Sequence, residues 1–297
     1  MSISNLPYNF NYLAPAKVNL SLHIGRKRRD GYHELVSFVG FTEFGDSLTV
    51  KVSDTDQLVL TGQFSADVDT KTSENLVMKA VKALRDYNND IPPIEIKIDK
   101  RIPVGGGLGG GSSDAATIFL ALNEIFNLCL SRANLENIAV KVGADIPVCL
   151  NRTFVVMRGI GDKITTISDA NISNYIVLAN PNSIANTSNV FEEFDKNALG
   201  KKSELPTGDK DLTRLLAGGN SLQESAIKIY PEIGLLLDTM KALNPKCSKI
   251  KPSSIQMSGS GASCFALFED KKTADMFCQK IQRAGYWSVS TKFISNF

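Results

Sequence analysis

The chain has 297 residues, of which 43% are hydrophobic and 22% charged, enough material for one large domain or two ordinary ones. Its formal net charge of +2 argues against nucleic acid or a membrane surface as a partner. The five cysteines are scattered without metal-ligand spacing, no apolar run approaches the roughly 18 residues of a membrane span, and the N-terminus lacks a secretory pattern. We therefore expect a cytoplasmic protein.

The first predicted strand, residues 17–24, alternates apolar and polar side chains. Its apolar residues share one face, while Lys17 and Asn19 lie on the opposite face with two further polar residues. One interpretation is a strand whose polar face is solvated. The other is that Lys17 and Asn19 point together into a site.

A basic cluster at 26–29 follows and ends in Asp30-Gly31-Tyr32-His33. Charged residues that end in Asp-Gly are typical of an exposed hairpin turn. The aromatic ring of Tyr32 also offers a stacking face to a nucleobase. Both interpretations stay open at this point.

Further strands are predicted at 35–41, 48–52 and 58–60, and a helix is predicted to begin at Ser73, its expected N-cap. Leu76 begins the apolar stripe of this helix. Capping explains the polar residues at this helix start, including Asn75, without any ligand.

The most informative stretch is Pro103-Val104-Gly105-Gly106-Gly107-Leu108-Gly109-Gly110-Gly111-Ser112-Ser113. Residues 94–99 before it alternate as a strand, and residues 118–126 after it have helical spacing. Glycine lets a ligand touch the backbone, and the free N–H groups of a helix start bind anions. Ser112 and Ser113 add hydroxyls able to cap the helix or reach a phosphate. We interpret the stretch as a phosphate-binding loop, with Lys100 well placed for a nucleotide.

Three other interpretations of the glycines compete with this one. A flexible linker does not usually lie between a strong strand and a strong helix. A dinucleotide fold requires an acidic residue after a second strand roughly 20 residues on, and that position here falls inside the predicted helix. The other phosphate loop, G-x-x-x-x-G-K-[ST], requires a lysine where this chain has Ser112.

A second helix is predicted at 132–142, with Ser131 as its cap and Gly143 as its end. Asp145 follows in a short apolar stretch, two residues before Pro147. Asp145 is either an ordinary turn or capping aspartate, or a carboxylate held in a poorly solvated place to accept a proton.

We expect one domain at 1–163 and a second at 164–297, since a strand at 153–158 closes the first half and one at 175–179 opens the second. Thr187 and Phe191 then lie in a stretch interpreted as a loop, where base rates favour a core position for the phenylalanine. A glycine turn, Ser258-Gly259-Ser260-Gly261, joins two short strands. The other elements predicted in this half are helices at 211–217, 221–229, 233–243 and 272–284 and strands at 255–257, 264–268 and 287–293.

These motifs resemble those of the GHMP kinases, the superfamily of galactokinase, homoserine kinase and mevalonate kinase. The doubled glycine triplet is most similar to the members that act on 4-diphosphocytidyl-2-C-methylerythritol in the non-mevalonate isoprenoid pathway. The resemblance is carried by Ala14-Pro15-Ala16-Lys17-Val18-Asn19, Asp30-Gly31-Tyr32-His33, Glu74-Asn75-Leu76, the glycine stretch, Gly143-Ala144-Asp145-Ile146-Pro147 and Ser258-Gly259-Ser260-Gly261.

The resemblance implies an α+β protein with two domains and the active site in the cleft between them. It implies ATP as co-substrate, Mg²⁺ bridging the phosphates, and the small molecule named above as phosphoryl acceptor. Lys17 and Asp145 are the implied catalytic residues. The implied ATP-binding residues are Asn75, Leu76, Lys100, Pro103, Val104, Gly105, Gly106, Gly107, Leu108, Gly109, Gly110, Gly111, Ser112 and Ser113, and the implied substrate-binding residues are Asn19, Tyr32, His33, Asp145, Thr187 and Phe191.

Two alternative functions stay open. The first is a GHMP kinase that acts on a different alcohol, such as homoserine or mevalonate. The second is a catalytically inactive nucleotide-binding regulator on the same scaffold. The presence of both Lys17 and Asp145 argues against the regulator.

Overall fold

The computed structural model describes residues 9–68, 75–168, 170, 172–198, 205–208, 212–244 and 255–294. The chain forms two compact units that interleave along the sequence. The first unit contains Met1–Ala16, Gly45–Val104 and Gly110–Leu150, and the second contains Lys17–Phe44, Gly105–Gly109 and Asn151–Phe297. The glycine stretch therefore contributes residues to both units. The expected domain boundary at residue 163 stays a prediction.

Two long strands, β1 (Phe10–Lys27) and β2 (His33–Val52), contribute residues to both units. In the first unit, β2 pairs with β4 through residues 47–52, and in the second it pairs with β5 through residues 35–39. The sequence predicted two separate strands at 35–41 and 48–52, where the structure has the continuous strand β2, which contains Gly45. The structure gives the reason for that glycine, since a Cβ at Gly45 would lie 2.0 Å from the carbonyl oxygen of Ala14.

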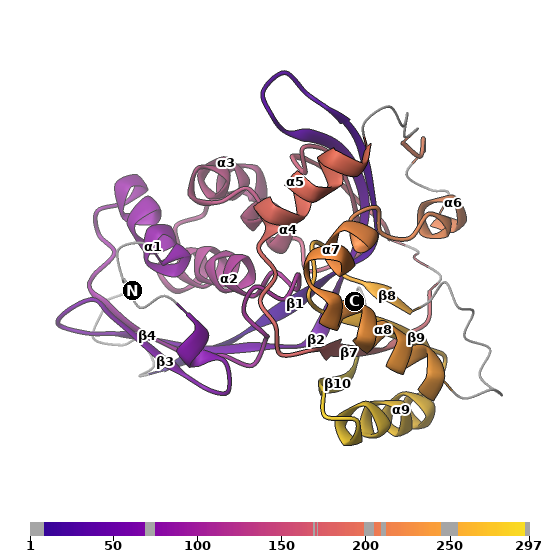
Figure 1. Cartoon of the computed structure of the whole chain (residues 1–297). Helices are drawn as coiled ribbons and strands as arrows, with labels where there is room; N and C mark the ends of the chain where they lie inside the picture. Colours follow the sequence, from indigo (N-terminus) through magenta and orange to yellow (C-terminus); the bar gives the residue numbers. More distant parts are fainter. Residues whose placement is uncertain are drawn as a thin grey trace. The chain divides into compact units, whose positions relative to one another are not determined.

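In the first unit, helices cover a small sheet in which β3 (Gln57–Thr61) runs parallel to β4 (Ile94–Asp99). Helix α1 (Leu76–Tyr87) packs against both α2 (Gly110–Ile125) and α3 (Arg132–Val142), and the three helices lie together in Figure 1. The unit is completed by the 3₁₀ turn η2 (Ser65–Asp67) and the short helix α4 (Ile146–Cys149). Its core is made of buried aliphatic and aromatic residues that include Leu48, Val81, Leu84, Ile96, Ile118 and Phe119.

Side-chain caps fix where two helices of this unit begin. Ser131 caps α3 as predicted, because its hydroxyl accepts the N–H of Asn134 at 3.2 Å. The cap of α1 is Asn75, whose side-chain oxygen accepts the N–H of Val77 at 2.9 Å. The prediction of Ser73 as the N-cap of this helix was therefore wrong, and Ser73 itself lies outside the described residues. The glycine stretch lies between β4 and α2, as the sequence predicted.

The second unit is built on an antiparallel sheet of strand order β10-β7-β9-β8. Its helix α9 packs against β7 and β10, and α8 packs against β8 and β9. A continuous apolar cluster fills the space between, with Val177, Leu237, Met257 and Phe277 among its members. The bounds are β5 (Val155–Gly159), β6 (Lys163–Thr166), β7 (Tyr175–Asn180), α6 (Leu212–Ala217), α7 (Gln223–Ile229), α8 (Pro231–Leu243), β8 (Ile255–Met257), β9 (Cys264–Phe268), α9 (Lys271–Arg283) and β10 (Trp287–Lys292).

A further helix of the second unit, α5 (Thr187–Ala198), corrects the expectation of a loop. Its first turn contains Ser188 and Asn189, residue types that are weak helix formers, so the local pattern did not predict it. Tertiary packing supplies the stability, because α5 contacts α7 and fully buries Val190. No helix in the described ranges has the length and hydrophobicity to cross a membrane.

Candidate active site

The polar face of β1 is buried within the second unit. Lys17 is 6% exposed and Asn19 is 5% exposed, and the two polar residues that follow on this face are equally enclosed. The interpretation of this face as solvated is therefore wrong. Buried polar side chains must be hydrogen-bonded or ion-paired, so this strand presents its polar groups to specific neighbours.

The glycine segment 105–109 is one of those neighbours. Its carbonyl groups accept hydrogen bonds from β1 and from the turn after β8: the Lys17 N–H donates to Leu108 O at 2.8 Å, and the Ser258 hydroxyl donates to Gly107 O at 3.0 Å. The Ser263 N–H also donates to Gly106 O, at 2.9 Å. Three segments distant in sequence therefore meet at one place in the second unit.

Two glycines of this segment are required by close contacts. Gly107 has φ +72°, and a Cβ there would lie 2.3 Å from Ser258 O. Gly109 has φ +66°, and a Cβ there would lie 3.2 Å from the Cβ and 3.3 Å from the Cε of Lys17. The Lys17 side chain thus runs directly along the backbone of Gly109. The left-handed conformation and the lack of space both exclude other residues.

Asn19 joins the same network. Its N–H donates to the Ser258 hydroxyl at 3.0 Å, and its Nδ2 donates to the hydroxyl of Ser37 at 2.7 Å. The Ser258 hydroxyl therefore links β1 to Gly107. Sequence reasoning placed Ser258 in a turn and missed this role, because a hydroxyl beside glycines in sequence does not reveal a partner 239 positions away.

In the first unit, the start of α2 lies beside Leu76. The Leu76 side chain is 4.0 Å from the position of a Cβ on Gly111 and 3.7 Å from one on Gly143. The structure thus brings Leu76, at the first residue of α1, to the first turn of α2. Ser113 donates its hydroxyl to Pro15 O at 2.7 Å, which accounts for this hydroxyl without a ligand. Ser112 is half-buried.

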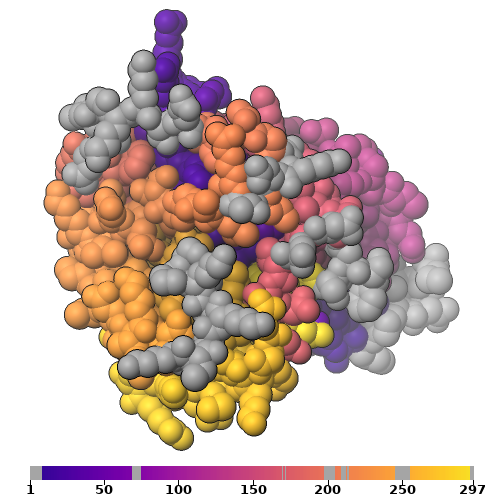
Figure 2. All heavy atoms as spheres, turned by 90° about the vertical axis from the view of Figure 1, so that its right-hand side faces the viewer, coloured from indigo at the N-terminus to yellow at the C-terminus, as the bar shows by residue number. Residues whose placement is uncertain are grey.

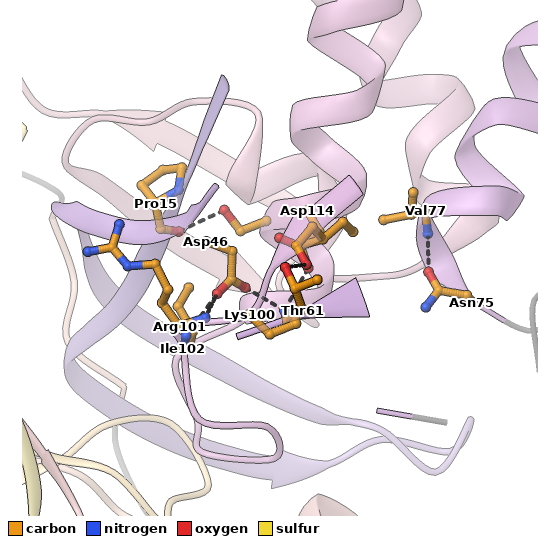
Figure 3. Close-up of polar contacts among 11 residues, drawn as sticks. Pro15, Asp46, Thr61, Asn75, Val77, Lys100, Arg101, Ile102 and Asp114 are labelled. Carbon is orange, nitrogen blue, oxygen red and sulfur yellow. Dashed lines mark hydrogen bonds and ion pairs between the residues drawn. The ribbon is translucent and has the colours of Figure 1, made fainter. Parts of the chain in front are cut away.

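Lys100 lies in a different environment from the one expected. Its side chain is 4% exposed, and its ammonium group binds the carboxylates of Asp46 and Asp114, both of which point toward it in Figure 3. Two carboxylates already neutralise this charge, so the geometry does not favour a direct contact with ATP. The sequence contains no signal for the pairing because Asp46 is 54 positions away.

Asp145 immediately precedes α4, whose residues 146–149 are buried. Its side chain makes no capping hydrogen bond to the helix, which argues against the simple capping explanation. Asp145 is exposed, so the prediction that its carboxylate lies in a poorly solvated place is wrong. The apolar neighbours turn into the core of the first unit and leave the carboxylate on the outside. Asp145 and Lys17 belong to different units.

The predicted base-binding turn is at the tip of the hairpin between β1 and β2, which projects from the second unit (Figures 1 and 2). Tyr32 is 61% exposed there. The side chain of His33 is buried instead, with its ring centroid 5.6 Å from that of Phe191 and 5.9 Å from that of Phe194. The structure therefore brings two of the predicted substrate residues, His33 and Phe191, together.

Asp195 on α5 is a partner of this cluster that sequence reasoning missed. Its carboxylate lies 2.8 Å from His33 Nε2, an ion-pair distance without the alignment of a hydrogen bond, and it also binds Lys27. His33 Nδ1 lies 3.2 Å from Gly25 O. The ring is thus held from both sides. The role of His33 in substrate binding stays a prediction.

Thr187, the first residue of α5, is linked to the glycine turn after β8. Its hydroxyl lies 2.8 Å from the hydroxyl of Ser260, at hydrogen-bond distance. Asn180 Nδ2 donates to the Ser263 hydroxyl at 2.9 Å in the same region. The turn therefore contacts the start of α5, the end of β7 and the glycine segment, all within the second unit.

A glycine segment against a buried lysine, followed by a helix N-terminus, is the arrangement that the sequence predicted for a GHMP kinase. Comparison with known proteins supports this class. The model of the GHMP kinases N-terminal domain matches residues 75–152, and the model of the GHMP kinases C-terminal domain matches residues 202–286. The chain belongs to the GHMP kinase family, so the resemblance and the two-domain α+β fold expected from the sequence are confirmed.

Within the family, the chain is similar to curated 4-diphosphocytidyl-2-C-methyl-D-erythritol kinases. It is 35% identical to the one from Mesorhizobium japonicum, over 93% of each chain. It is 37% identical to that from Shewanella woodyi, over 88% of this chain and 86% of the relative. A crystal structure of 4-(cytidine 5'-diphospho)-2C-methyl-D-erythritol kinase has a TM-score of 0.78 at 28% identity, covering 97% of this chain and all of that one.

Proposed function

We propose that this chain is an ATP-dependent kinase that phosphorylates the 2-hydroxyl of 4-diphosphocytidyl-2-C-methylerythritol. The support comes from the names of its relatives and from the arrangement of the second unit. The observation that carries the proposal is the Lys17 side chain running along the backbone of Gly109. That contact brings the stem of the Lys17 side chain to the backbone of the glycine segment, and its ammonium group is assigned to the charge of the transferring phosphoryl group.

Phosphate binding is assigned to the glycine segment and the first turn of α2. The N–H groups at the start of a helix have no intrahelical partner and carry the positive end of the helix dipole. Asn75 and Leu76 are assigned to the nucleotide base, since Leu76 lies beside this turn. Mg²⁺ bound together with ATP would neutralise part of the charge of the phosphates, whose oxygens are its preferred ligands.

Proton transfer is assigned to Asp145. In the proposed step the carboxylate takes the proton of the acceptor hydroxyl, the hydroxyl oxygen attacks the γ-phosphorus, and ADP leaves. Lys17 stabilises the charge that develops on the phosphoryl oxygens. The exposure of Asp145 suits a base that must meet a substrate from solution.

Recognition of the cytidine is assigned to Tyr32, His33 and Phe191. The exposed ring of Tyr32 is available for stacking on a base, and the ring contact between His33 and Phe191 supplies an aromatic wall in the same unit. Asn19 and Thr187 are assigned to the rest of the substrate. A cytoplasmic location and the absence of a nucleic-acid partner remain part of the proposal.

The test is ATP turnover with the diphosphocytidyl substrate measured beside homoserine and mevalonate at equal concentrations. We expect turnover of the diphosphocytidyl substrate to exceed that of the other alcohols by at least about 10³-fold, because a site built for a polar base rejects ligands that lack it. Preferred turnover of another alcohol would make the chain a different GHMP kinase. ATP binding without turnover of any alcohol would favour the regulator.

A further inference from the structure

A buried ionic triad lies in the first unit, at the two ends of the phosphate-binding loop. Asp46, Lys100 and Asp114 have side chains that are at most 4% exposed. They come from three segments: Asp46 from β2, Lys100 from the residues that follow β4, and Asp114 from the first turns of α2. Charged side chains are almost never this deeply buried unless they are paired, and the burial is costly.

The first end of the loop is held by Asp46. Its Oδ1 accepts the N–H of Arg101 at 2.6 Å and of Ile102 at 2.8 Å, and its Oδ2 binds the Lys100 ammonium group. The main chain of Lys100 is fixed as well, because its N–H donates to Thr61 O at 2.7 Å. These contacts fix the path of the backbone that leads into Pro103, and Figure 3 shows the Asp46 carboxylate against Arg101 and Ile102.

The second end of the loop is held by Asp114. Its Oδ2 accepts a hydrogen bond from Lys100 Nζ at 2.7 Å, so one ammonium group joins the entry of the loop to the helix that follows it. Asp46 also lies against the first residue of α2, since a Cβ on Gly110 would be 3.5 Å from its Oδ2. The Oδ1 atom of Asp114 has no hydrogen-bond partner in the described part of the chain.

Charge balance alone does not explain why Asp114 is part of the triad. A single Lys100–Asp46 pair would already balance the charge, and Asp114 adds a second buried carboxylate with one unsatisfied oxygen. An apolar residue at position 114 would avoid that cost. Asp114 adds a hydrogen bond from Lys100, which connects the end of β4 to the first turns of α2. The N–H groups at the start of α2 are the ones assigned to the phosphates.

We propose that Asp114, acting through Lys100 and Asp46, is a positioning residue for ATP. The triad fixes the first turn of α2 relative to the end of β4. The backbone N–H groups of that turn therefore keep the arrangement that a polyphosphate requires. The inference rests on the proposed function, because it takes the loop to be the ATP site. It replaces the expected direct contact of Lys100 with the nucleotide by an indirect role.

The experiment compares Asp114→Leu, which has the same number of side-chain heavy atoms but cannot accept a hydrogen bond, with Asp114→Asn, which can. In the kinase assay we expect Asp114→Leu to raise KM for ATP at least about tenfold, with KM for the diphosphocytidyl substrate within about twofold of the wild type. Asp114→Asn should restore KM for ATP to within about threefold of the wild type, because its Oδ1 can still accept the Lys100 N–H.

The matched control is Asp56→Leu in the same unit. Asp56 also joins a cation to a strand end, through Arg85 at 2.8 Å and the N–H of Ile94 at 3.0 Å, but it lies at the opposite end of β4. Asp56→Leu should lower the melting temperature and leave KM for ATP unchanged. If Asp114→Leu behaves like Asp56→Leu, or if Asp114→Asn is as impaired as Asp114→Leu, the proposal is overturned.

Two further measurements separate the possible failures. If Asp114→Leu does not fold, as judged by circular dichroism, Asp114→Ala takes its place, because it leaves Lys100 and Asp46 as a balanced pair. Hydrogen exchange of the amides at 101–113 should be faster in the Leu or Ala variant than in Asp114→Asn, and equal rates would contradict the proposal. A wild-type protein that neither binds nor turns over ATP would contradict the proposed function instead.

Discussion

At the scale of single residues, Lys17 and Asp145 have opposite environments. Lys17 is buried in a strand of the second unit, and Asp145 is exposed before a short helix of the first. The side chain of Lys17 is enclosed by its surroundings, whereas a substrate can approach the exposed Asp145 from solvent. The proposed division of work, with a fixed cation for the phosphates and an accessible base for the hydroxyl, follows from this difference.

Asp145→Asn tests the proposed base. The amide keeps the shape of the side chain but cannot accept the proton, so we expect kcat to fall by roughly 10²–10⁴-fold, with ATP binding by calorimetry unchanged. Asp54→Asn, an exposed aspartate in a turn of the same unit, is the control and should keep wild-type kcat. An Asp145→Asn variant with near wild-type kcat would remove Asp145 from the mechanism.

Gly107→Ala tests the tight contact in the glycine segment. The added methyl group would lie 2.3 Å from Ser258 O in a backbone of φ +72°, so the segment must move away from the turn after β8. We expect ATP affinity to fall at least about tenfold, because the phosphate-binding backbone moves with it. Calorimetric titration with ATP measures the effect.

The control for this glycine is Gly285→Ala in the same unit. Gly285 has φ +90°, but a Cβ there meets nothing within 4 Å. The control therefore carries the conformational cost of about 1–2 kcal/mol without a clash. Equal ATP affinity in Gly107→Ala and Gly285→Ala would show that the close approach to Ser258 is not needed, and would restore the interpretation of the glycines as a linker.

At the scale of elements, helix α5 packs its side chains against His33, next to the turn of the hairpin between β1 and β2. Phe191, Phe194 and Asp195 all lie on this helix and face His33 at the start of β2. The helix therefore organises the ring that the sequence placed in the cytidine site. Its first residue, Thr187, also contacts Ser260 in the glycine turn after β8.

Asp195→Ala tests this role of α5. Without the carboxylate, the His33 ring and Lys27 lose a shared partner, and we expect KM for the diphosphocytidyl substrate to rise about fivefold or more while KM for ATP stays unchanged. Asp238→Ala is the control, since Asp238 pairs with Lys241 on α8 at 3.3 Å. An Asp195→Ala variant that weakens only ATP would assign the hairpin to the nucleotide instead.

At the scale of the whole molecule, the buried triad makes stability depend on pH. Burial raises the pKa of Asp114 to about 7, against the attraction of Lys100, and the neighbouring Asp46 raises it further. The pKa of Lys100 is also raised, because the two carboxylates outweigh the effect of its own burial. In the folded state the proton on Asp114 is therefore retained well above the ordinary pKa of an aspartate, about 3.9.

The sign of the resulting pH dependence can be tested. Between pH 4 and 7 the unfolded chain has lost the Asp114 proton that the folded chain keeps, so this group's contribution to the free energy of unfolding falls as pH rises, by at most about 1.4 kcal/mol per pH unit. Asp114→Asn removes the titration. Urea denaturation at pH 5 and pH 8 should show the Asn variant gaining stability relative to the wild type at the higher pH. An identical difference at both pH values would contradict the shift.

The sequence by itself determined the class of this protein. A phosphate loop is contiguous, and its glycines, its preceding strand and its following helix are all encoded by neighbouring residues. The same holds for Lys17 and Asn19 on one strand face and for Asp145 after a helix end. The family expected from these motifs is confirmed by the comparisons, and the elements that flank them lie where the local patterns predicted.

Only the tertiary structure decided what surrounds these residues. The polar face of β1 is buried by such surroundings. The link from Asn19 to Ser258 and the triad around Lys100 join positions 14 to 239 residues apart. The helix α5 forms because it packs on α7, and the exposure of Asp145 results from where its apolar neighbours are buried. Such contacts depend on three-dimensional packing and leave no local pattern, because the residues that make them are ordinary in their own sequence context.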